Sequence, residues 1–118
     1  MGFWLVAVGG AFGASLRFFA QYRYDGSSFP WGTLACNLLG CFIIGMILPQ
    51  IKSGSLFKEL VIFGCLGAFT TFSSFAWQLM KMLEVSEFKL AASYWLVSSF
   101  GTVICCYFGY ALSKIWTS

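Results

Sequence analysis

The sequence predicts an all-α membrane protein of four transmembrane helices. Hydrophobic residues make up 59% of the 118-residue chain and charged residues only 9%, whereas a soluble domain usually carries about a quarter charged residues. The apolar residues fall into four runs that can each cross a hydrocarbon core of about 30 Å, which takes roughly 20 helical residues. Too few polar residues remain to cover a water-soluble domain.

The four runs define the expected helices in chain order. The first, residues 2–22, has no basic start and no cleavage site typical of a secretory signal, so we expect it to be retained. The second, 29–51, follows Ser28, a suitable N-cap, and has Pro30 in its first turn. The third, 56–82, and the fourth, 87–116, follow Ser55 and Ser86. Because the connections are short, we expect residues 1–118 to form one transmembrane domain.

Basic residues near the ends of the spans normally set the orientation of a membrane protein. Here they are nearly balanced: Lys52, Lys58 and Lys114 fall on the side of the termini, and Arg23, Lys81 and Lys89, with Arg17 as a fourth candidate, on the other. This balance predicts insertion in both orientations, and therefore an antiparallel, dual-topology homodimer. A misleading count from so few charges is an equal alternative. Small residues such as Gly9 and Gly13 would let helices pack closely in lipid.

Polar residues inside membrane spans are candidates for function. Thr33 and Asn37 are one turn apart in the second span, and the Asn37 amide can donate hydrogen bonds to an anion. The alternative is a hydrogen bond that only holds two helices together. Tyr94, Ser98 and Thr102 recur every four residues and place three hydroxyls on one helix face. The more common alternative for each hydroxyl is a bond back to a carbonyl one turn earlier.

The middle of the third span predicts a broken helix. Residues 64–75 include Gly64, Gly67 and four hydroxyl residues, which weaken a helix, and a break at this depth is tolerated only inside protein or beside water. Phe72 and Phe75 are spaced to share a face, and the positive edge of a ring can favour a small anion. Simple packing is the usual role of such a pair.

Two observations bear on the class of function. Arg17 lies inside the first span, where it would commonly snorkel to the interface or, alternatively, give a pore vestibule a positive bias. The chain has no histidine, no mid-membrane carboxylate, no catalytic triad and no metal cluster, so we expect neither an enzyme nor a proton relay. The small, scattered net charge of +3 gives no indication of nucleic-acid binding.

Three segments, in order and at matching spacing, resemble the signatures of the Fluc/CrcB family of fluoride channels. The first is Gly-Gly-Ala-Phe-Gly-Ala-Ser-Leu-Arg at residues 9–17. The second is Gly-Thr-Leu at residues 32–34, followed by Asn37, Gly40 and Gly45. The third is the core of the third span, residues 64–75. The resemblance covers essentially the whole chain.

The resemblance implies a passive, fluoride-selective channel in the cell inner (plasma) membrane that exports fluoride and relieves its toxicity. It implies an antiparallel homodimer with two pores and a structural sodium ion held by backbone carbonyls at the break. The implied fluoride pore comprises Asn37, Phe72, Phe75, Tyr94, Ser98 and Thr102, and the implied sodium ligands are Gly67 and Thr70. We add Thr33 to the predicted pore because it lies one turn from Asn37 on the same helix face. The chain departs from the family at Gln78, where members often have Glu. A proton-coupled small multidrug exporter and a non-conducting scaffold are the alternative functions.

Overall fold

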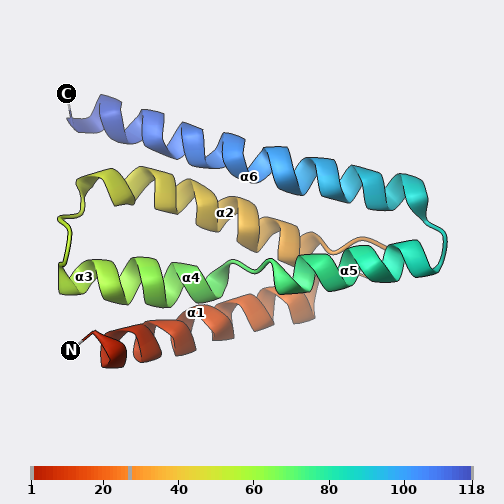
Figure 1. The fold of residues 1–118 in the computed structure, drawn as a ribbon, viewed down its shortest axis with the longest axis horizontal. Helices are drawn as coiled ribbons and strands as arrows, with labels where there is room; N and C mark the ends of the chain where they lie inside the picture. Colours follow the sequence, from red (N-terminus) through yellow and green to blue (C-terminus); the bar gives the residue numbers. More distant parts are fainter. Residues whose placement is uncertain (1, 27, 118) are drawn as a thin grey trace.

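The computed structural model describes residues 2–26 and 28–117. It contains four helical spans, each antiparallel to the one before it, with both ends of the chain on the same side (Figure 1). The first span is α1 (Phe3–Tyr24), the second is α2 (Trp31–Ile47) with a 3-10 turn, η1 (Leu48–Gln50), and the fourth is α6 (Phe88–Thr117). The third is divided into α3 (Leu56–Lys58), η2 (Glu59–Leu66), α4 (Gly67–Phe69) and α5 (Ser73–Glu84).

The four predicted spans are confirmed. Each of the four helical segments is long and apolar enough to cross a membrane, and the expected boundaries differ from the observed ones by only a few residues. The described part of the chain contains no β-strand, only an isolated bridge between Asp25 and Pro30. The chain is therefore a multi-pass all-α membrane protein.

The helices form a thin slab rather than a closed bundle. Its extents are 46 × 33 × 19 Å, so the slab is less than two helices thick, given a helix diameter of about 10–12 Å. α2 packs chiefly on α6, and α1 packs chiefly on η2. A Cβ at Gly13 would collide with the backbone carbonyl of Cys65, and one at Gly109 with that of Phe42. Small residues thus allow both contacts, as predicted.

The start of α2 differs from expectation. Ser28 does not cap it, and the structural N-cap Pro30 has no side-chain capping bond. Instead the chain folds back after α1, and the Asp25 carboxylate accepts a hydrogen bond from the Thr33 backbone N–H at 2.8 Å. A carboxylate suits this position because the N-terminus of a helix carries partial positive charge.

The third span is broken near its middle, as predicted (Figure 1). Gly67 keeps helical angles (φ −60°, ψ −38°), and the backbone becomes extended only at Thr70 (φ −86°, ψ 151°). The interruption therefore covers residues 70–72, beginning beyond Gly67. The sequence did not predict that η2 is wound as a π-helix, a form often found near functional sites.

Candidate functional site: a polar cavity at the broken helix

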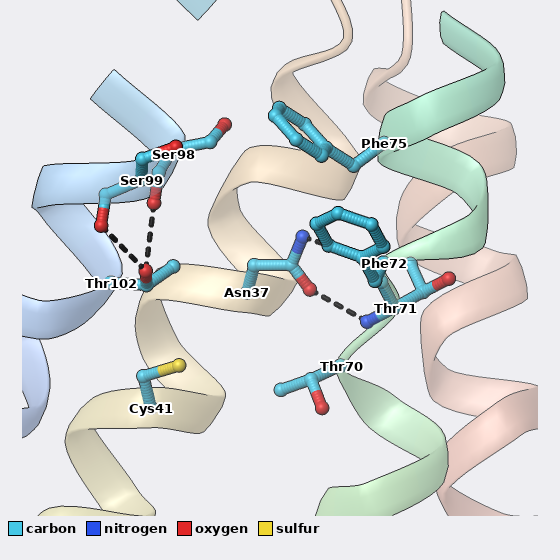
Figure 2. Close-up of a pocket in the computed structure, with 9 residues that line it drawn as sticks. All are labelled: Asn37, Cys41, Thr70, Thr71, Phe72, Phe75, Ser98, Ser99 and Thr102. Carbon is cyan, nitrogen blue, oxygen red and sulfur yellow. Dashed lines mark hydrogen bonds between the residues drawn. The ribbon is translucent and has the colours of Figure 1, made fainter. Parts of the chain in front are cut away.

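The interruption is held open by Asn37 of α2. Its side-chain oxygen accepts a hydrogen bond from the Thr71 backbone N–H at 2.7 Å, and its Nδ2 donates to the Thr71 carbonyl at 3.0 Å. Figure 2 shows Asn37 reaching across to the extended segment. One side chain thus replaces both helical partners of Thr71, which would otherwise be unpaired at membrane depth.

Two threonine hydroxyls define the ends of the interruption. The Thr70 hydroxyl, directly after α4, donates to the Leu66 carbonyl at 3.0 Å. The Thr71 Oγ1 accepts from the Ser74 backbone N–H at 3.2 Å, which satisfies a donor in the first turn of α5. Hydroxyl residues compete with the helical backbone in this way, so the local sequence explains why the helix stops and restarts here.

Two carbonyls at the interruption lose their usual helical partners. In a continuous helix the Gly67 carbonyl would bond to the Thr71 N–H and the Thr70 carbonyl to the Ser74 N–H. Both amides are engaged elsewhere, with Asn37 and with the Thr71 hydroxyl respectively. These are the two carbonyls that the resemblance implies as sodium ligands, and oxygen atoms released from a helix are suitable ligands for a hard cation.

A cavity of about 230 Å³ lies beside the interruption, between α2, α5 and α6. Five of the predicted pore residues line it: Asn37, Phe72, Phe75, Ser98 and Thr102. Figure 2 shows them converging from three separate elements. The cavity is also lined by Cys41, Thr70, Thr71 and Ser99.

The hydroxyls of α6 are not equivalent. The Thr102 hydroxyl donates back to the Ser98 carbonyl at 2.8 Å, which is the alternative that the sequence left open. Ser98 is only 5% exposed, and its Oγ has no hydrogen-bond partner among the described residues. Because an unpaired buried hydroxyl is costly, Ser98 is the lining group best placed to donate to a bound species.

The two phenylalanines lie together but in different surroundings. Their ring centroids are 5.6 Å apart, with the planes tilted by 52°. Phe75 is 5% exposed and makes an edge contact with the Tyr94 ring at 5.0 Å, whereas Phe72 is 78% exposed. Phe72 belongs to the interruption rather than to α5, which explains why helical spacing does not give the two rings the same environment.

Two other predicted pore residues lie outside this cavity. Tyr94 is fully buried, and its hydroxyl donates to Gln78 Oε1 at 2.6 Å. Thr33 is also fully buried, and its hydroxyl donates to Asp25 Oδ2 at 2.8 Å. Both belong to a hydrogen-bonded group at the end of the molecule that holds the α1–α2 connection.

Arg17 is bonded inside the protein, although such a residue more commonly snorkels to the membrane interface. Its Nε donates to the Ala68 carbonyl at 2.9 Å, just before the interruption, and its Nη1 donates to Gln21 Oε1 at 3.1 Å. The side chain is half-buried. An acceptor carbonyl exposed by the broken helix keeps the guanidinium inside the protein. Without such a partner, the side chain would extend toward water.

The sequence could have indicated some residues that were missed. Gln21 lies within the first span and Gln78, noted above only as a departure from the family, lies within the third, and polar residues there merit attention whatever their type. Thr71 stood within the predicted break, but its backbone contacts depend on Asn37. Nothing in the local sequence connects Asp25 with Gln78.

Comparison with known proteins identifies the family. The family described as "CrcB-like protein, Camphor Resistance (CrcB)" matches residues 4–110. A protein named fluoride-specific ion channel FluC from Chlorobium phaeobacteroides is 42% identical over 118 residues, covering 95% of this chain and 92% of the relative. A protein of the same name from Magnetococcus marinus is 38% identical, covering 93% and 95%.

A third relative, from Leptospira interrogans, is 37% identical over 119 residues and covers 95% of this chain and 90% of its own length. It is also named a fluoride-specific ion channel, so these relatives are channels and not enzymes. Matches of this extent span all four helices and the interruption. The chain therefore belongs to the CrcB family of membrane ion channels.

Proposed function

We propose that this protein conducts fluoride passively and selectively, and that it exports fluoride from the cytoplasm across the inner membrane. The observation that carries the proposal is the cavity at the broken helix, because it combines the Asn37 amide, the Ser98 hydroxyl and the Phe75 ring. The names of the relatives agree with this function.

Fluoride holds its hydration shell tightly, so a selective path must replace water with other donors without binding too strongly. The unpaired Ser98 hydroxyl supplies one donor, and the edges of Phe72 and Phe75 supply weak positive surfaces. Hydrogen fluoride enters cells as a neutral acid and dissociates inside, and a passive channel lets the trapped anion leave down its electrochemical gradient.

Purified protein in liposomes should release fluoride and retain chloride. The efflux should persist when the membrane potential is clamped and no proton gradient exists, because no acidic residue lies in mid-membrane. A fluoride electrode outside the vesicles measures this, with protein-free vesicles as the control. Flux that strictly requires a proton gradient would instead indicate an exporter, and no flux would indicate a scaffold.

We further propose an antiparallel homodimer with two pores. The 19 Å slab leaves large apolar side chains such as Phe12 and Phe100 exposed, and a second copy would cover part of this surface. Reporter domains fused to the C-terminus should show both orientations in the membrane, since the basic residues are balanced across it. A single uniform orientation would contradict the proposal.

A structural sodium ion on the axis of this dimer is part of the same proposal. The Gly67 and Thr70 carbonyls, deprived of their helical amides, would hold it with those of the second copy. Replacing sodium with a large organic cation at equal ionic strength should lower the temperature at which the purified dimer dissociates, because a bound ion stabilises the state that binds it. Equal stability in both salts would exclude the ion.

A further inference from the structure

Asp25 is the common acceptor of two hydrogen-bonded chains at the α1–α2 end of the molecule. Its Oδ2 accepts from the Thr33 hydroxyl at 2.8 Å and from Gln78 Nε2 at 3.1 Å. Its Oδ1 accepts from the Thr33 backbone N–H at 2.8 Å. An ionised carboxylate only accepts hydrogen bonds, so every group that faces Asp25 must present a hydrogen.

This requirement fixes the direction of the bonds that lead to α6. Gln78 must turn its amide nitrogen toward Asp25, and the same nitrogen donates to Thr33 Oγ1 at 2.8 Å. The Gln78 oxygen then faces Tyr94 and accepts its hydroxyl hydrogen at 2.6 Å. The two ends of an amide have nearly the same shape. The Asp25 charge therefore decides which end meets the tyrosine.

A second chain runs to Asp25 from the broken helix. Arg17 donates to the Gln21 oxygen at 3.1 Å, and the Gln21 nitrogen donates to Thr33 Oγ1 at 3.0 Å. Arginine has only donors, so it orients Gln21 as firmly as Asp25 orients Gln78. A donor-only cation and an acceptor-only anion thus terminate one chain, and their charges offset each other.

The Tyr94 ring, bonded through its hydroxyl to Gln78, lies between residues that line two different cavities. Asp25, Gln78 and Phe29 line a second cavity of about 570 Å³ near the α1–α2 connection, whereas Phe75 lines the cavity at the interruption. The Tyr94 ring contacts Phe75 and Phe29 at centroid distances of 5.0 Å and 5.2 Å. Tyr94 thus lies between a ring that lines one cavity and a ring that lines the other.

We propose that Asp25 is a positioning residue for conduction. It fixes the Gln78 amide and the Tyr94 hydroxyl so that their hydrogens are already bonded when fluoride passes. The inference rests on the proposed function of the cavity. A free Tyr94 hydroxyl would bind fluoride strongly, and conduction requires an ion to leave each site as easily as it enters.

The D25N substitution should reverse the orientation of the Gln78 amide. The Thr33 N–H holds the oxygen of the introduced amide, so the nitrogen of that amide faces Gln78 Nε2 and forces Gln78 to turn. Tyr94 then loses its acceptor, and fluoride efflux should fall about tenfold, as expected for a residue coupled to its neighbours. The Q78E substitution should also reduce efflux about tenfold, because it places a second carboxylate against Asp25.

The double substitution D25N/Q78E is the decisive experiment. The amide introduced at position 25 can donate to the carboxylate introduced at position 78, and that carboxylate can still accept from Tyr94. Efflux should therefore return to within about threefold of wild type, a non-additive recovery. Losses that add up in the double variant would overturn the proposal. A rise in efflux for D25N alone would also overturn it, because that result would mean that the Asp25 carboxylate only repels fluoride.

The matched control is Q50E, which adds a negative charge at the opposite end of the molecule. Gln50 lies in η1, where its amide donates to the Ser113 hydroxyl at 2.9 Å, and it lines neither of the two cavities. Its replacement should leave efflux unchanged. A loss as large as that of Q78E would show that added charge alone slows fluoride, and would overturn the proposal.

Thermal stability of the wild type and of the D25N, Q78E and double variants separates this inference from the proposed function. The two single variants should melt at lower temperature than wild type, and the double variant should recover. If the melting temperatures follow this pattern but the wild-type protein releases no fluoride, the proposed function is rejected. A role for Asp25 in conduction is then rejected with it. Efflux from wild type with additive losses would reject the inference alone.

Discussion

Replacing Asn37 with alanine should abolish measurable fluoride efflux and lower stability by roughly 2–4 kcal/mol, because each buried backbone group left unpaired costs about 1–3 kcal/mol. Both the Thr71 N–H and the Thr71 carbonyl depend on the Asn37 amide. Without these two hydrogen bonds, the extended segment loses the contacts that hold its conformation. Liposome efflux and thermal unfolding of the purified protein measure the two effects.

An N37D variant is the matched control for shape. Aspartate keeps the bond from the Thr71 N–H but cannot donate to the Thr71 carbonyl, and it places a negative charge on the cavity wall. Its stability should lie between wild type and alanine, while its efflux should be as low as that of alanine. Normal efflux in the alanine variant would mean that the interruption is held by other contacts.

Replacing Phe72 or Phe75 with isoleucine should reduce fluoride efflux about tenfold, since an aromatic edge contact contributes roughly 0.5–1.5 kcal/mol. Isoleucine keeps much of the bulk but has no positive ring edge. The two variants should differ in stability. Phe72 is 78% exposed, so its replacement should be nearly neutral, whereas the buried Phe75 packs against Tyr94 and its replacement should destabilise the protein.

The control for this pair is F3I, at the start of α1. Phe3 is 86% exposed and lies outside the lining of the cavity, so efflux should not change. Efflux and unfolding should be measured on the same preparations, which separates a lost ring edge from a damaged fold. Unchanged efflux in both F72I and F75I would return these rings to a packing role.

Much of the fold follows from patterns that act over one or two turns. Apolar runs of sufficient length predicted all four spans, and two glycines with four hydroxyl residues predicted the interruption in the third. The hydroxyls of Thr70 and Thr71 do end one helix and start the next. Helical spacing also placed Ser98 and Thr102 on the face of α6 that lines the cavity.

The roles of the polar side chains, in contrast, depend on residues far away in the chain. Asn37 bonds to Thr71 rather than pointing freely into a path, and Arg17 bonds to Ala68 rather than to water at the interface. Sequence spacing gives the face on which a side chain lies, but its partner is set by how helices pack.

Tertiary structure alone decided the two assignments with the largest consequences. It brought Asp25, in the α1–α2 connection, to Gln78 in the third span. This contact sets the orientation of the Gln78 amide, which the sequence does not specify. It also left Phe72 exposed while burying Phe75. The sequence by itself determined four spans, a break and a set of donors. Which donors are already bonded depends on direction and distance between helices, because a hydrogen bond needs both.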